Sequence, residues 1–151
     1  MKFNIALIAA SIAAAATVAA PAAANESRAE VRGGIAWSGG QEEAIAGVAV
    51  GHDFDLGSAA FAGVEASADK VLAGGAEILW GATARAGVKL GAGKLFVAGG
   101  HTFTEGQDAW HLGGGYQHAI GSNLYVKAEY RRYFYDFNDV NVLNAGVGVR
   151  F

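Results

Sequence analysis

The chain has no cysteine and a single proline among its 151 residues. Without cysteine there is no disulfide framework, no thiol nucleophile and no thiolate metal site. Charged residues are scarce too, at 17% of the chain against roughly 25% in an ordinary soluble domain. The 11 lysines and arginines are outnumbered by 14 acidic residues, so there is no basic stripe for phosphates and nucleic acid is not an expected partner.

What the chain has in quantity is apolar residues, 52% of the total, and 23 glycines. That apolar content excludes a disordered chain, and the length predicts one domain.

Residues 1–24 have the composition of a secretory signal peptide. Lys2 supplies a positive charge, an apolar stretch follows, and Ala22-Ala23-Ala24 offers a small-residue cleavage site. An N-terminal membrane anchor is the alternative, and it fits the Ala-x-Ala ending less well. We therefore expect a cleaved signal at 1–24 and a mature domain at 25–151. After the signal, no window has the roughly 18 uninterrupted apolar residues that a spanning helix requires.

The mature sequence alternates apolar and polar residues with period 2, broken by clusters of Gly, Asp, Asn and Ser. This pattern is typical of an all-β barrel or sandwich. Helices are disfavoured because glycine recurs within nearly every run and costs about 1 kcal/mol in a helix interior. The sequence predicts eight strands, at 28–37, 44–54, 59–68, 77–90, 95–104, 109–119, 123–135 and 140–151.

The two faces of these strands differ in kind. In the seventh run Val126 and Tyr130 fall on an apolar face, while Lys127 and Glu129 fall on the other. A soluble ligand-binding barrel would turn the apolar face inward, whereas an outer-membrane barrel turns it towards lipid. The even strand number is the rule for bacterial membrane barrels and favours the second architecture.

Tryptophan and glycine placement point the same way. Trp37 ends the first run while Trp80 and Trp110 begin the fourth and sixth, so a meander brings all three to one rim as an aromatic girdle. Tryptophans that cap a soluble core are the alternative reading. A narrow lumen also needs small residues beside large charged ones, which accounts for the glycines on the charged face: Gly47, Gly51, Gly63, Gly81, Gly87, Gly113, Gly115, Gly146 and Gly148.

The stretch WHLGGGYQHAIGSNLYVKAEYRRYFYDFNDVNVLNAGVGVRF resembles the last three strands of the OmpA-like, opacity-type outer membrane protein β-barrel family, often labelled porin family protein. Upstream, GVAVGHDFDLG and FAGVEASAD are similar to the family's second and third strands, although His52 stands where tyrosine is commoner. The resemblance implies an eight-stranded antiparallel up-and-down transmembrane β-barrel. It also implies that Val147, Val149 and Phe151 form a C-terminal signal for the outer-membrane assembly machinery.

Inside such a barrel, charges of both signs on one face are expected to pair, because an unpartnered buried charge costs several kcal/mol. The predicted lumen network comprises Glu30, Arg32, Glu65, Arg85, Lys127, Glu129, Arg131 and Arg150. It can be a gate or ion path, or a plug that fixes strand register. We favour the plug, since eight strands enclose an interior just wide enough for side chains to fill.

Catalytic and metal chemistry are not expected. His52, His101 and His118 fall at interfacial positions and His111 points inward, with no metal-ligand spacing among them. The best local serine–histidine pair is His118 with Ser122, but Ser122 lies in a GSN turn where serine is common for turn chemistry alone. No cofactor is predicted.

The sequence thus predicts a monomeric outer-membrane barrel of a Gram-negative bacterium, in contact with outer-membrane lipid and lipopolysaccharide and with the assembly machinery during biogenesis. Its expected role is structural or in envelope integrity, with weak passage of small solutes as an addition. A soluble periplasmic ligand-binding barrel and an outer-membrane lipid-modifying enzyme remain as alternatives.

Overall fold

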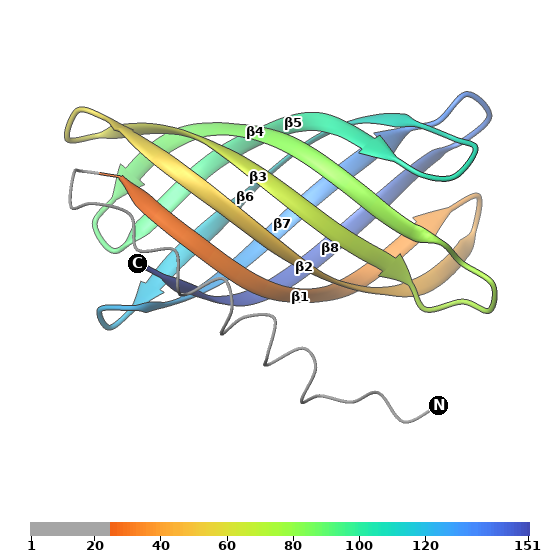
Figure 1. Ribbon diagram of the computed structural model, residues 1–151, viewed down its shortest axis with the longest axis horizontal. Coiled ribbons are helices and arrows are strands. Elements are labelled where there is room, and N and C mark those ends of the chain that lie inside the picture. Colours follow the sequence, from red (N-terminus) through yellow and green to blue (C-terminus); the bar gives the residue numbers. More distant parts are fainter. Residues whose placement is uncertain (1–24) are drawn as a thin grey trace.

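The computed structural model describes residues 25–151, which form eight antiparallel strands closed into a barrel (Figure 1). The strands are β1 (Glu26–Ser38), β2 (Gln41–Leu56), β3 (Ala60–Val71), β4 (Ile78–Leu90), β5 (Gly93–Phe103), β6 (Ala109–Ile120), β7 (Leu124–Phe134) and β8 (Asp139–Arg150). The predicted eight-stranded antiparallel up-and-down barrel is confirmed. The predicted signal peptide, residues 1–24, lies outside the described residues. Within 25–151 no helix is long and apolar enough to cross a membrane.

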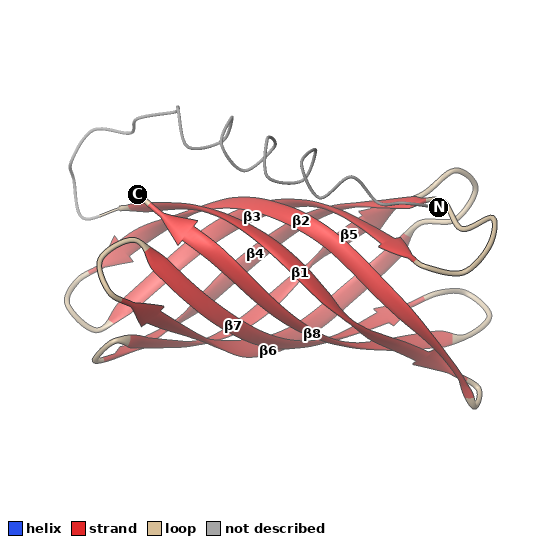
Figure 2. Cartoon of the chain, turned by 90° about the horizontal axis from the view of Figure 1, so that it is seen from below, coloured by secondary structure: helices blue, strands red, loops and turns tan. Residues whose placement is uncertain are grey.

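The barrel has two rims with different turns (Figure 2). One rim holds the start of β1, the end of β8 and three turns, at 57–59, 91–92 and 121–123; we call it the terminal rim. Turns at the opposite rim span 39–40, 72–77, 104–108 and 135–138. Trp37, Trp80 and Trp110 all lie within a few residues of these turns, so we call this end the tryptophan rim.

The pairing of β1 with β8, which closes the barrel, extends to Phe151. The backbone N–H of Ser27 donates to the carbonyl of Phe151 at 2.8 Å, and the Phe151 N–H donates back at 2.9 Å. From there the β1–β8 register runs from Arg28 opposite Arg150 to Trp37 opposite Asn141. Pairing up to Phe151 satisfies backbone groups that would be costly to expose in hydrocarbon.

The tightest connection at the tryptophan rim is the two-residue turn between β1 and β2. Gly39 and Gly40 have φ of 57° and 85°. Positive φ at both central residues is the geometry of the hairpin turn whose twist matches that of the strands, and glycine adopts it without a steric penalty.

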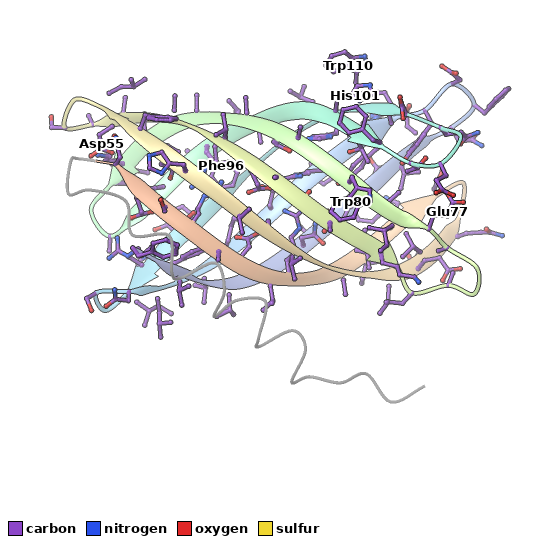
Figure 3. The ribbon with its side chains drawn as sticks, in the orientation of Figure 1. Asp55, Glu77, Trp80, Phe96, His101 and Trp110 are labelled. Atoms are coloured by element: carbon purple, nitrogen blue, oxygen red, sulfur yellow. The ribbon has the colours of Figure 1, made fainter. Side chains whose placement is uncertain are left out.

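Strand faces are oriented as a membrane barrel requires. Trp80 and Val147, with exposed fractions of 58% and 54%, point away from the wall, whereas Lys127 and Glu129 are 3% and 2% exposed inside it. In Figure 3 Trp110 projects outward from the barrel. The apolar side chains thus form the outer surface and the ionic side chains the interior.

The interior is less uniformly ionic than the alternation predicts. Near the terminal rim Phe61, Phe96 and Ala98 form a small apolar cluster, over which the guanidinium of Arg85 lies 5.0 Å from the Phe96 ring centroid. A second cluster, near the tryptophan rim, consists of Ala36, Ile45, Tyr133 and Val142. The ionic side chains are concentrated between these two clusters.

Candidate functional site: the lumen and its two mouths

The centre of the lumen holds equal numbers of buried cations and anions. Each of these residues is at most 5% exposed. The cations are Arg28, Arg32, Arg85, Lys127 and Arg131, and the anions are Glu30, Asp53, Glu65, Asp69 and Glu129. We call these ten residues the central network. The formal charges of the central network therefore sum to zero.

Glu65 on β3 is the hub of the central network. Its carboxylate accepts hydrogen bonds from Arg28 Nη1 at 2.7 Å, from Arg32 Nη1 at 3.0 Å and from Arg131 Nη2 at 2.6 Å. Lys127 Nζ lies 3.6 Å from the same carboxylate. One acidic side chain thus contacts four cations from strands β1 and β7, across the barrel's full interior.

A second group of contacts surrounds Lys127. Its Nζ lies 2.6 Å from Glu30 Oε1, and the hydroxyl of Tyr125 donates to the other Glu30 oxygen at 2.8 Å. Glu129 pairs with Arg131 and lies 3.6 Å from Lys127. These side chains bridge β1 and β7 through the lumen rather than around the wall.

Both ends of the central network are closed by bidentate arginine–carboxylate pairs. Towards the tryptophan rim, Arg32 donates to the two oxygens of Asp69 at 2.7 and 2.5 Å. Towards the terminal rim, Arg85 donates to Asp53 at 2.9 and 2.5 Å and to Gln117 at 3.1 Å. Two parallel hydrogen bonds between one guanidinium and one carboxylate fix both the position and the orientation of the two side chains.

Asp53 and Asp69 were not among the predicted lumen residues, although the sequence carried the signal. Asp53 is in phase with Gly51 within the predicted strand 44–54, so strand parity puts it on the inner face. Asp69 is in phase with Glu65 and Ser67, but it lies one residue beyond the predicted strand 59–68, and β3 in fact continues to Val71.

Seven of the eight predicted lumen residues lie in the centre. The eighth, Arg150, lies half-buried at the terminal rim, where the lumen opens, and pairs with Glu26 at 3.1 Å. Lys94 contacts both Glu26, at 2.7 Å, and Asp53, at 2.9 Å, and so connects Arg150 to the central network.

Inward-facing glycines make room for these side chains. A Cβ at Gly51 would lie 2.5 Å from Arg28 Nη2, and a Cβ at Gly81 would lie 2.5 Å from Ser67 Oγ. At Gly47 and Gly63 it would collide with the carboxylates of Asp69 and Asp53 respectively. The glycines on the charged face therefore accommodate side chains from neighbouring strands.

The four histidines have separate environments. His111 lies inside, between the hydroxyls of Thr83 at 2.9 Å and Thr102 at 3.0 Å. His101 packs between Phe103 and Trp110 on the outer face, each ring centroid 4.7 Å away, with interplanar angles of 52° and 83°. Within residues 25–151 no group of three or more His, Asp or Glu side chains is arranged so that it could hold a metal ion.

The two mouths of the lumen differ in chemistry. At the terminal rim a polar cavity of about 510 Å³ is lined by ion pairs, among them Lys89 with Asp55 at 2.6 Å and Lys94 with Glu26 at 2.7 Å. At the tryptophan rim lies a larger apolar cavity of about 580 Å³, which we call the cup. The cup's walls are Ala36, Ile45, Val71, Leu79, Tyr133, Tyr135, Phe137, Val140 and Val142, and its edge carries Ser38, Glu77, Thr104, Gln107 and Asn138.

Neither a protein-family model nor a curated protein matches this sequence. Solved structures do match. The N-terminal β-barrel domain of Pseudomonas aeruginosa OprF gives a TM-score of 0.60 at 14% identity, over 82% of this chain and 97% of that one. Ail, the attachment invasion locus protein of Yersinia pestis, gives 0.59 at 13% identity, over 84% and 98%. Neisserial surface protein A gives 0.55 at 17% identity, over 87% and 100%.

The fold is that of an eight-stranded outer-membrane β-barrel. This confirms the transmembrane type in the predicted fold class. At such low identities the likeness extends to the fold alone, so the role has to be argued from the lumen and its mouths.

Proposed function

We propose that the protein resides in the outer membrane of a Gram-negative bacterium as a closed barrel with a structural, envelope-integrity role. Its sequence resemblance to the opacity-type family and its fold support the location. We assign the terminal rim to the periplasmic side of the membrane because its turns are the shorter set. The tryptophan rim then faces outward from the cell. Direct contact with outer-membrane lipid and lipopolysaccharide and a monomeric state are parts of the same proposal.

The outer surface supports a membrane setting. Trp80 and Trp110 are 58% and 66% exposed near one rim, while Phe54 and Tyr116 are more than 40% exposed on the outer face towards the other. Two belts of exposed aromatic side chains with an apolar band between them match the interfaces of a bilayer. A soluble barrel would lose solubility with this much apolar surface in water.

The observation that carries the closed-barrel proposal is the balanced central network. An ion crossing the lumen would have to separate pairs such as Lys127 with Glu30, or pass without its hydration shell between side chains already bonded to one another. The same pairs join strands across the interior and so stabilise their register. We therefore favour a plug, and the weak solute passage expected from sequence is the competing possibility that swelling assays address.

Fractionation and solute uptake test the two halves of this proposal. The protein should stay in the membrane fraction until detergent is added, and its folded form should migrate differently from the boiled form in SDS. Proteoliposomes carrying it should not swell in isotonic arabinose beyond empty liposomes. Recovery in a detergent-free wash would support the soluble periplasmic alternative, and swelling would support a pore.

Catalysis is not part of the proposal, although one serine–histidine contact bears on it. His118, the histidine of the best local pair in the sequence, bonds to Tyr116, and Ser122 bonds to Asn123. Instead Ser27 Oγ lies 2.8 Å from His52 Nδ1 near the terminal rim. Within residues 25–151 no carboxylate bonds the second nitrogen of His52, so the orienting acid of a triad is absent from that site.

Lipid profiles decide the enzymatic alternative. Cells with and without the gene should give the same lipid A and phospholipid mass spectra. A species that disappears on deletion, and is not restored by Ser27→Ala, would instead assign acyl chemistry to the Ser27–His52 contact. The matched control is Ser122→Ala, which leaves that contact intact.

A further inference from the structure

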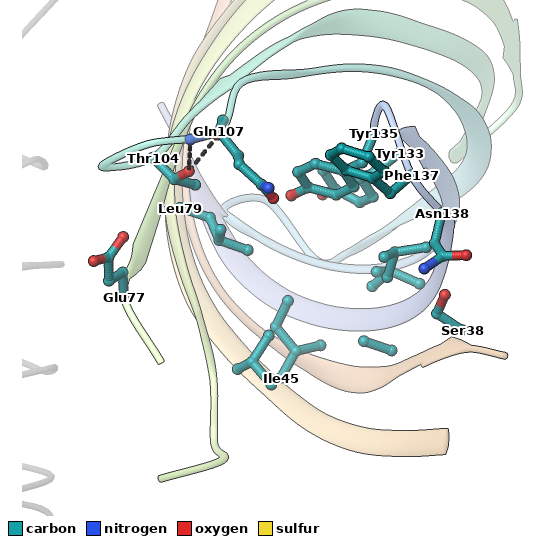
Figure 4. Close-up of a pocket in the computed structure, with 14 residues that line it drawn as sticks. Ser38, Ile45, Glu77, Leu79, Thr104, Gln107, Tyr133, Tyr135, Phe137 and Asn138 are labelled. Atoms are coloured by element: carbon teal, nitrogen blue, oxygen red, sulfur yellow. Dashed lines mark hydrogen bonds between the residues drawn. The ribbon is translucent and has the colours of Figure 1, made fainter. Parts of the chain in front are cut away.

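The cup at the tryptophan rim is a site that a purely structural role leaves unused. It is open at the rim, has a volume of about 580 Å³ and is walled by inward-facing residues of β1, β2, β3, β4, β7 and β8. Figure 4 shows Tyr133, Tyr135 and Phe137 along one wall, facing Ile45 and Leu79 across the space. Its size falls within the roughly 300 to 1,000 Å³ typical of small-molecule sites.

The walls of the cup consist of apolar and aromatic side chains. Ile45, Tyr133 and Val142 are each under 5% exposed, and Leu79 and Val140 pack against them. Water in such a space has few hydrogen-bonding partners, so its displacement by an apolar ligand is favourable. Phe137, 85% exposed at the edge, adds an aromatic face at the entrance.

Polar groups in the cup lie mostly at its edge and are mostly neutral. In the part of the chain that the structure describes, Glu77 is the one charged side chain lining it, at the exposed edge. Burial raises the pKa of the Tyr135 hydroxyl above its ordinary value, so this group stays protonated at neutral pH and can donate a hydrogen bond. The lining therefore suits a neutral ligand with one polar substituent, and a carboxylate at its edge disfavours anions.

The floor of the cup is closed by the central network. Two positions deeper on the same strands, Asp69 follows inward from Val71, Arg131 from Tyr133 and Asn144 from Val142, and all three are at most 5% exposed. Asp69 is tied to Arg32 by two hydrogen bonds. With this arrangement of side chains beneath it, the cup is open to a ligand from the tryptophan rim.

We propose that the cup binds a small neutral aromatic molecule carrying one hydroxyl-type substituent. The ring lies among Tyr133, Ile45 and Leu79, and the substituent reaches the Tyr135 hydroxyl. Binding requires only the open tryptophan-rim mouth, so it does not depend on whether the lumen beneath conducts.

A matched pair of probes tests the chemical class. 2-Naphthol is neutral at neutral pH, and 2-naphthoate has the same ring system with a negative charge. With the protein in lipid nanodiscs, methyl NMR of inward Ile45, Leu79 and Val142 is compared with that of outward Ile35 and Leu143. We expect saturable shifts of the inward methyls with 2-naphthol, and at least about tenfold weaker binding of 2-naphthoate.

Two outcomes would overturn the proposal. Equal affinity for both probes would contradict the neutral lining, and non-saturating shifts of inward and outward methyls together would mean that the probe only dissolves in the bilayer. A substitution pair then locates the site: Ala36→Phe fills the cup and should weaken 2-naphthol at least about tenfold, whereas Ile35→Phe, its neighbour on the lipid-facing side, should leave it unchanged. The comparison of probes on the unsubstituted protein stands whether or not either variant folds.

Discussion

The centre of the lumen and the cup above it are built by the same strands in the same inward phase, yet they differ in nearly every respect. In the centre, five cationic and five anionic side chains are buried together, and inward-facing glycines leave room for them. In the cup, the inward positions nearer the tryptophan rim carry Ile45, Val71, Leu79 and Tyr133, and about 580 Å³ stays open. The difference shows that one barrel can hold buried ion pairs at mid-depth and an apolar cavity at its mouth.

The largest loss of stability is expected on substitution of Glu65, the hub of the central network. Glu65→Gln keeps the shape of the side chain but leaves Arg28, Arg32 and Arg131 short of a shared anion. Leaving buried charge unpaired costs about 3 to 5 kcal/mol, so the free energy of unfolding should fall by that order. Urea-induced unfolding in lipid bilayers measures it, and a loss under about 1 kcal/mol would show that the network is solvated.

A smaller loss of stability should distinguish the buried cluster of Phe61, Phe96 and Ala98 from the open cup. Ala98→Phe adds a ring beside Phe61 and Phe96, where all three side chains are at most 3% exposed, and should cost about 1 to 3 kcal/mol. Ala36→Phe adds the same ring into the cup and should cost less. The same unfolding assay compares them, and equal losses would mean that the cup is not available space.

The smallest effect belongs to the terminal mouth. Lys89 and Asp55 are paired at 2.6 Å, but both side chains are 23% exposed where the lumen meets solvent. Asp55→Asn should therefore change the unfolding free energy by no more than about 1 kcal/mol, and less at high salt. A loss as large as that of Glu65→Gln would place this pair with the central network.

Much of the architecture could be predicted from the sequence because successive side chains of a strand alternate between its two faces. Alternation at period 2 located all eight strands and put Arg85, Lys127 and Glu129 inside, and the meander put three tryptophans at one rim. Asp53 and Asp69 obeyed the same parity and were missed because single acids near strand ends look like turn residues.

Other features had no periodic signal. Arg150 has the inward parity, but the depth of a residue along the axis depends on strand stagger, which placed it at the rim with Glu26. The cup depends on inward apolar residues from six strands reaching one level, which single-strand patterns do not show. The role of Val147, Val149 and Phe151 in assembly stays a prediction, although Phe151 does complete the β1–β8 closure.

Single-channel recording in planar bilayers tests the central claim that balanced ion pairs close the lumen. The unsubstituted protein should show no steady conductance. The double variant Glu30→Ala/Lys127→Ala removes one cation and one anion from the centre, preserves neutrality and leaves space for water, so it should open measurable channels, while Lys89→Ala/Asp55→Ala at the terminal mouth should not. Steady channels from the unsubstituted protein, with the same conductance in the double variant, would contradict the account.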